Sequence, residues 1–201
     1  WGPWSRTCRP DGTDGSRSSG IRERPTQMGD AEQETLEDDW RNRSISMATF
    51  DEFYKSLPED SNKRGEYFEK VFVPWFLKTD PEWSSQVQEV WLWDDYPQRW
   101  GKDCGIDLVY EDPQGKHWAV QSKCVSPDYE IPKKDIDSFL SESNDSRIHG
   151  RLLIVSTDGI GKNALQVIER QEKQVVLFLR ENFQHSAVQF PDSHNNLAGG
   201  G

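Results

Sequence analysis

The chain has 201 residues, of which 33% are apolar, and a formal net charge of −11 at pH 7. This length accommodates one domain of ordinary size with a tail at either end, and nine Trp and nine Phe supply bulky side chains for a core. The negative charge weighs against a broad basic surface of the kind used for non-specific DNA binding, without excluding a nucleic-acid partner.

The absence of visible targeting signals and the pattern of cysteines both indicate an intracellular protein. No apolar run approaches the length of a membrane span and no signal peptide is visible, so we expect a cytoplasmic protein with no membrane association. The three cysteines, Cys8, Cys104 and Cys124, form no C-x-x-C pair. This pattern favours free thiols in a reducing compartment over a disulfide framework or a zinc site.

Composition divides the chain into three parts. Residues 1–46 are rich in Gly, Ser, Arg, Asp and Pro without hydrophobic period, so we predict a disordered tail. Residues 47–181 carry the periodic segments and are predicted to form the folded domain. Residues 182–201 are polar and end in Gly, which predicts a loose C-terminal tail. Because the first residue is Trp and the last three are Gly, we interpret the chain as a fragment, in which Met47 directly precedes the first periodic segment.

The hydrophobic pattern predicts an α/β fold, a mixed sheet flanked by helices in the order α-β-β-β-α-β-α-β. A short helix capped by Thr49 and Glu52 precedes this series. We predict helices over 50–56, 62–78, 133–140 and 163–171, and strands over 86–93, 106–111, 117–123, 151–157 and 175–179. Pro74 is expected to kink or shorten the second helix, and the apolar run Leu152–Val155 predicts a strand buried on both faces.

A predicted β-hairpin from Asp103 to Lys123 carries the most informative chemistry. Apolar and polar residues alternate on either side of a Pro-Gln-Gly turn. Because strand side chains alternate with period 2, we expect Asp107 on one strand to meet Gln121 and Lys123 on the next at one edge of the sheet. An acid, an amide oxygen and an ammonium group brought together are the parts of a metal-dependent phosphodiesterase.

Hydrolysis of a phosphodiester needs a divalent ion that neutralises developing charge and supplies hydroxide near neutral pH. Mg²⁺ prefers oxygen ligands and keeps several waters, so few protein ligands suffice. We expect Mg²⁺, or Mn²⁺ in its place, to bind the Asp107 carboxylate, the Gln121 amide oxygen and the backbone carbonyl of Ser122. Lys123 is expected to hold the attacking water or to stabilise the transition state. Glu69, on the predicted helix, is expected to bind the ion through a water or to support a second ion.

Six short motifs follow one another along the chain. They are Lys63-Arg-Gly-Glu-Tyr-Phe-Glu, Val90-Trp-Leu-Trp, Asp103-Cys-Gly-Ile-Asp-Leu-Val, Trp118-Ala-Val-Gln-Ser-Lys, Ile136-Asp-Ser-Phe-Leu and Ser156-Thr-Asp with Lys162-Asn-Ala. Together, over about residues 48–179, they resemble the Mrr-like branch of the PD-(D/E)xK nuclease superfamily. Within that branch they are similar to the N-terminal nuclease domain of type I single-polypeptide (type ISP) restriction-modification enzymes and of related predicted helicases.

The resemblance implies a restriction-endonuclease-like fold that begins at Met47. It also implies a metal-dependent endonuclease domain that cuts double-stranded DNA in defence against foreign DNA. It implies that Asp107 is the metal carboxylate, Gln121 the variant acidic position, Lys123 the catalytic lysine and Glu69 the helix acid. In that family an ATP-driven translocase and a methyltransferase follow the nuclease domain. We therefore expect ATP to act only through modules downstream of these residues, and a transient dimer to form for double-strand cleavage.

Two other interpretations of the chain stay open at this stage. One is a catalytically inactive DNA-binding or assembly domain of the same fold, with Gln121 marking the loss of the site. The other is a small α/β interaction module with no nucleic-acid role. Asp103 is either a second carboxylate or a cap of the turn at Gly105. The Gly159-Ile-Gly-Lys162 segment does not meet the P-loop pattern and is predicted to be a loop that enters a helix.

Overall fold

The computed structural model describes residues 48–102 and 105–197. A five-stranded sheet lies at the centre of this domain, in the order β1-β2-β3-β5-β7. Its strands are β1 (Glu89–Leu92), β2 (Leu108–Glu111), β3 (His117–Lys123), β5 (Ile148–Val155) and β7 (Val175–Phe178). The pairs β1–β2 and β2–β3 are antiparallel, whereas β3–β5 and β5–β7 are parallel. The predicted mixed sheet of an α/β fold is thus confirmed.

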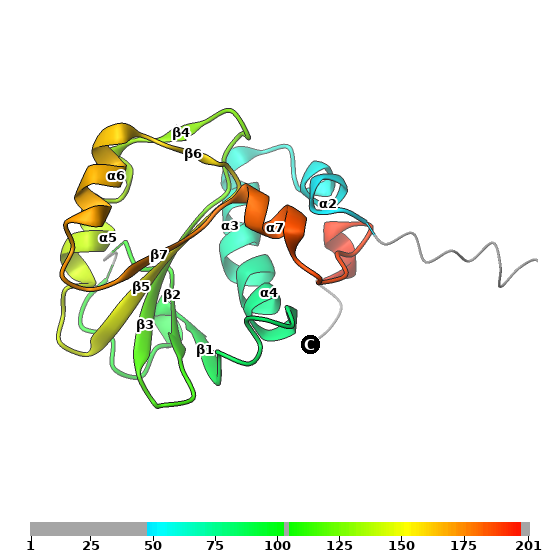
Figure 1. Ribbon diagram of the computed structural model, residues 1–201. Coiled ribbons are helices and arrows are strands. Elements are labelled where there is room, and N and C mark those ends of the chain that lie inside the picture. The colour runs from blue at the N-terminus through cyan, green and yellow to red at the C-terminus, as the bar shows by residue number, and fades with distance from the viewer. Residues whose placement is uncertain (1–47, 103–104, 198–201) are drawn as a thin grey trace, which may run out of the picture. The chain divides into compact units, whose positions relative to one another are not determined.

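Helices cover both faces of the sheet (Figure 1). One face packs against α2 (Phe50–Ser56), α3 (Ser61–Tyr67), the π-helical segment η1 (Phe68–Phe72), α4 (Val73–Thr79) and α7 (Arg180–His185). The other face packs against α5 (Asp137–Glu142) and α6 (Lys162–Glu169). Short elements complete the domain: η2 (Trp93–Asp95), η3 (Lys133–Asp135), η4 (His194–Asn196), and a small parallel sheet of β4 (Glu130–Ile131) and β6 (Gly159–Ile160).

The first helix begins as predicted, at a capping box. The backbone N–H of Thr49 donates to the Glu52 carboxylate at 2.8 Å, and the backbone N–H of Glu52 donates to the Thr49 hydroxyl at 3.3 Å. Both groups would otherwise be unpaired N–H donors at a helix start. Phe50 and Phe53 on this helix are buried in the core, so the cap fixes the start of a helix that contributes side chains to the core.

The long helix predicted over 62–78 forms from Ser61 to Thr79, with a π turn in its middle. The backbone N–H of Val73 donates to the carbonyl of Phe68, five residues earlier. A proline inside a helix removes the hydrogen bond to the carbonyl four residues before it and pushes that carbonyl away. For Pro74 that carbonyl belongs to Lys70, so the helix widens at this point instead of breaking.

The hairpin and the central strand also form where the pattern predicts them. Leu108 pairs with Val120, and the turn between the strands holds Gly115 at φ +73°, a left-handed conformation that favours glycine. Strand β5 lies between β3 and β7, and its Leu152–Val155 run is buried on both faces. The first strand is shorter than the predicted 86–93.

The predicted loose tail over 182–201 is wrong for residues 182–197. Helix α7 inserts Phe183, which is fully buried and stacks at 4.4 Å on Phe50. Phe190 is buried as well and forms a β-bridge with Ala48. These two aromatic residues help to hold the segment, because each buries a large apolar surface.

Several expectations fall outside the described residues. They are the disordered tail over 1–46, the start at Met47, the role of Asp103, and the states of Cys8 and Cys104. Cys124 is a free, partly buried thiol. Of the residues that the structure describes, none belongs to a helix with the length and hydropathy of a membrane span.

Candidate active site

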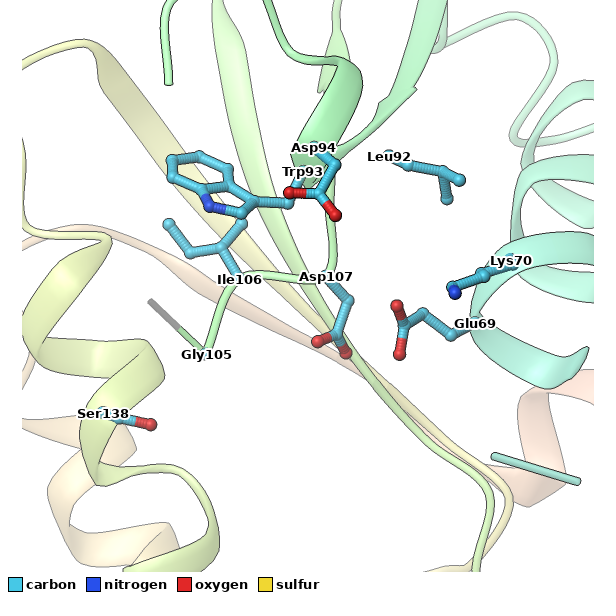
Figure 2. Close-up of a pocket in the computed structure, with 9 residues that line it drawn as sticks. All are labelled: Glu69, Lys70, Leu92, Trp93, Asp94, Gly105, Ile106, Asp107 and Ser138. Carbon is cyan, nitrogen blue, oxygen red and sulfur yellow. The ribbon is translucent and has the colours of Figure 1, made fainter. Parts of the chain in front are cut away.

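A cleft of about 530 Å³ opens where the π turn, the start of β2 and the first turn of α5 meet. Figure 2 shows its labelled lining, with the carboxylates of Glu69 and Asp107 pointing toward each other from opposite walls. The residues that line it are Glu69, Lys70, Leu92, Trp93, Asp94, Gly105, Ile106, Asp107 and Ser138. Helix and hairpin therefore bring together two of the predicted site residues that lie far apart in the sequence.

Asp107 is held by the strand that faces it. Its backbone N–H donates to the Val120 carbonyl at 2.9 Å, which continues the β2–β3 ladder by one residue. Its Oδ2 accepts the backbone N–H of Ser122 at 2.7 Å and the Ser122 hydroxyl at 3.1 Å. Burial raises the pKa of Asp107, and the two Ser122 hydrogen bonds and the Lys123 charge oppose that rise. One carboxylate oxygen is thus fixed by Ser122.

Glu69 is the second carboxylate of the cleft and is partly buried. Desolvation and the nearby Asp107 carboxylate raise its pKa to about 7, against a small opposing effect of Lys70. Two like charges in one cleft disfavour the ionisation of both carboxylates at once. The site is therefore a pair of coupled acids that a cation would complete.

Gln121 lies one residue beyond Val120, opposite Asp107 in the antiparallel register. Its side chain is only 5% exposed, and its Oε1 is a buried atom without a hydrogen-bond partner within the described part of the chain. An unpartnered buried amide oxygen costs free energy, which a bound cation or an ordered water would recover. Lys123 is partly buried at the end of β3, where its charge acts on Asp107.

The available oxygens fit a hard divalent ion that retains water. Within the described residues no three His, Cys, Asp or Glu side chains are placed to enclose a metal. Mg²⁺ needs no such cage, because one or two carboxylates with amide, carbonyl and water oxygens complete its octahedron. The Asp107 carboxylate in the cleft and the unpartnered Oε1 of Gln121, which is not among the residues that line the cleft, are the oxygens available to such an ion, with Glu69 across the cleft.

Some residues of the cleft were not among those predicted from the sequence. Lys70 follows Glu69 directly, and an ordinary α-helix gives no reason to place both at one cleft. Asp94 lies in η2 and pairs with Arg99 at 2.6 Å. Ser138 reaches the cleft because Gly105 approaches α5 so closely that a Cβ on Gly105 would lie 2.5 Å from the Ser138 hydroxyl. Contacts between such distant segments have no local sequence signal.

Glu69 gives the metal-free protein a specific pH dependence. Its folded-state pKa of about 7 exceeds the ordinary glutamate value of 4.5, so its protonation stabilises the fold at low pH. This contribution is complete below the unfolded pKa and is lost as the pH rises through about 7. We expect Glu69→Gln to flatten the fall in melting temperature between pH 5 and pH 8, measured by thermal unfolding with EDTA. Glu66→Gln, an exposed change on the same helix, is the matched control, and equal pH dependence in wild type and Glu69→Gln would contradict the burial argument.

A mixed sheet covered by helices, with a carboxylate-lined cleft at the start of a hairpin, places this domain in the class of restriction-endonuclease-like folds. Residues 78–197 match the Mrr-type family model described as Restriction endonuclease. The chain belongs to this family, and the predicted resemblance to its Mrr-like branch is confirmed. The matched range includes Asp107, Gln121 and Lys123, whereas Glu69 precedes it.

Solved structures of restriction enzymes are also similar to this chain. The chain is 26% identical, with a TM-score of 0.53, to the ATP-dependent type ISP restriction-modification enzyme LlaBIII bound to DNA, over 62% of this chain and 8% of that one. This chain thus spans a small part of that enzyme. The MspJI restriction endonuclease in complex with a 27-mer oligonucleotide matches at 17% identity and TM-score 0.41, over 83% of this chain and 34% of that one. The DNA modification-dependent restriction endonuclease AspBHI matches at 15% identity and a TM-score of 0.37, over 84% of this chain and 38% of that one. None of the curated proteins compared with the chain matches it.

Proposed function

We propose that the domain is a divalent-metal-dependent DNA endonuclease that hydrolyses phosphodiester bonds in a restriction system. The observation that carries this proposal is the buried, unpartnered Oε1 of Gln121, a residue that faces Asp107 when the Leu108–Val120 register is continued by one residue. An oxygen left without a donor in the interior is suited to a cation. Family membership and the DNA bound to the type ISP relative support the choice of DNA as the substrate.

Each residue of the site has a chemical role in this proposal. Asp107, Gln121 and the Ser122 carbonyl hold Mg²⁺, or Mn²⁺ in its place. When bound, the ion neutralises charge on the phosphate and lowers the pKa of a bound water. Ser122 orients Asp107 through its N–H and hydroxyl. Lys123 places a positive charge where negative charge develops on the phosphate, and Glu69 would bind the ion through a water or support a second ion.

The larger assembly is also part of the proposal. Because one cleft cuts one strand, we expect a single copy to nick DNA and two copies to cooperate transiently in a double-strand cut. The 8% coverage of the type ISP relative leaves room for a translocase and a methyltransferase in the full-length protein. ATP would then act on those modules, and the cleavage chemistry would stay with the residues described above.

The test is nicking of supercoiled plasmid DNA by the chain as it stands. We expect nicking with Mg²⁺, none with EDTA, and a loss of about 100- to 1,000-fold in rate for Lys123→Met, because an aligned charge at the transition state is removed. Lys116→Met is the matched control, since Lys116 is an exposed lysine of the same hairpin that contacts His149 near the turn. An inactive domain of the same fold would show no metal-dependent nicking, and full activity of Lys123→Met would show that the assignment is wrong.

A further inference from the structure

We propose that Lys70 contacts a backbone phosphate of the DNA and so holds one strand beside the cleft. This inference rests on the proposed function and adds to it the residue that binds the polyanion. Lys70 lines the cleft together with Glu69 and Asp107, and Figure 2 shows its ammonium group beside the Glu69 carboxylate. Of the described residues that line the cleft, Lys70 is the single side chain with a positive charge.

The electrostatics of the cleft favour such a contact. The chain carries a net charge of −11, and the cleft itself holds the carboxylates of Glu69, Asp94 and Asp107. A DNA strand that enters this cleft meets like charge unless a cation lies at the entrance. The Asp94 carboxylate already forms an ion pair with Arg99, with 2.6 Å between Asp94 Oδ1 and Arg99 Nη1. Lys70 is therefore the cation placed to receive a phosphate at the wall opposite Asp107.

The π turn explains why Lys70 reaches the cleft. In a π turn the hydrogen bonds span five residues instead of four, so successive side chains diverge by a smaller angle. Glu69 and Lys70 both lie within η1 (Phe68–Phe72) and both line the cleft. The widened turn next to Pro74 thus gives one wall of the cleft an acid and a base side by side.

The ion pair that Lys70 makes in the free protein is weak enough to be replaced. Its Nζ lies 2.9 Å from Glu66 Oε1, with side chains that are 50% and 63% exposed. Exposed pairs of this kind contribute little, because water screens both charges. A phosphate can therefore replace Glu66 as the ion-pair partner of the Lys70 ammonium group. Glu66 therefore competes with DNA for Lys70. Removing Glu66 should strengthen DNA binding, whereas removing Lys70 should weaken it.

Lys78 offers a matched control. It lies on the same long helix, is 54% exposed, and faces Glu89 at 3.6 Å, but it does not line the cleft. If Lys70 were an ordinary surface lysine, the two would behave alike. We expect them to differ in DNA binding and to be equivalent in thermal stability.

The experiment is fluorescence anisotropy of a labelled DNA duplex with wild type, Lys70→Gln, Glu66→Gln and Lys78→Gln, in EDTA so that no cleavage occurs. Loss of one phosphate contact lowers the slope of log affinity against log salt by about 0.9. The deficit of Lys70→Gln should therefore shrink about 3.5-fold between 50 and 200 mM salt. Glu66→Gln should bind about 1.5- to 5-fold more tightly than wild type, and Lys78→Gln should match wild type.

The outcomes separate this inference from the function on which it rests. If wild type binds and nicks DNA but Lys70→Gln has the affinity and salt slope of Lys78→Gln, the Lys70 contact is overturned and the nuclease assignment stands. If Glu66→Gln weakens binding, the competition is overturned. If wild type neither binds the duplex nor nicks plasmid with Mg²⁺, both proposals fail. The predicted order, Glu66→Gln tightest and Lys70→Gln weakest, supports the contact.

Discussion

Replacing Asp107 with asparagine is expected to lower the DNA nicking rate by about 1,000-fold or more while raising the melting temperature of the metal-free protein at pH 8. The rate falls because the proposed ion loses its carboxylate ligand, which contributes several kcal/mol to transition-state stabilisation. The stability rises because burial raises the pKa of Asp107, so its ionised form is unfavourable in the fold at this pH. The amide oxygen of asparagine can still accept both hydrogen bonds from Ser122.

The opposite signs of these two effects separate chemistry from folding. A variant that merely misfolds loses activity and stability together. Asp112→Asn is the control, because Asp112 lies at the turn of the same hairpin and accepts the N–H groups of Gln114, Lys116 and Trp118. We expect its nicking rate to stay within about threefold of wild type, since the changed group does not touch the cleft. Nicking by Asp107→Asn within tenfold of wild type would remove Asp107 from the site.

Arg151→Ala is expected to lower the free energy of unfolding by about 3–5 kcal/mol. The guanidinium of Arg151 is fully buried on β5 and donates to the Ser143 hydroxyl at 2.6 Å, the Leu140 carbonyl at 3.0 Å and the Lys173 carbonyl at 3.3 Å. Burial lowers its pKa, and among the ion pairs of the described residues none includes it. Alanine would remove the donor of three hydrogen bonds, two of them buried, and leave a cavity beside their acceptors.

Arg151 also connects the core to the cleft. It holds the last turn of α5 to the central strand, and the first turn of the same helix carries Ser138 into the cleft. Urea denaturation at fixed pH measures the effect. Arg147→Ala is the control, because Arg147 is 36% exposed and pairs with Asp145, so its loss should cost about 1 kcal/mol or less. A loss below 1 kcal/mol for Arg151→Ala would contradict the role of the buried hydrogen bonds.

Much of the fold could be predicted because its signals are local. The capping box at Thr49, the alternation on either side of the Pro-Gln-Gly turn, and the continuous apolar run of β5 each specify their own element. Asp107 and Gln121 followed from the hairpin, since period-2 alternation and a short turn fix which residues face one another. The sequence alone therefore predicted the two strands that carry Asp107 and Gln121.

Other features depend on contacts that no local pattern records. Phe183 and Phe190 stand alone in a polar stretch, and their burial follows from the rings they meet across the domain. The sequence offered Glu66 and Glu69 one turn apart, and the structure leaves Glu66 exposed and places Glu69 in the cleft. The π turn beside Pro74 adds Lys70 to that wall. The unpartnered state of Gln121 Oε1 depends on every neighbour of β3 and emerges only in three dimensions.

The central claim is that Asp107 and Gln121 hold a divalent cation. Anomalous scattering from crystals of the chain soaked in Mn²⁺ tests it most directly, because it locates the ion without reference to activity. We predict one strong peak within bonding distance of a carboxylate oxygen of Asp107 and of Gln121 Oε1, and no such peak in crystals of Asp107→Asn. An Asp107–Gln121 site that stays free of Mn²⁺ while other surfaces of the same crystal bind it would contradict the account.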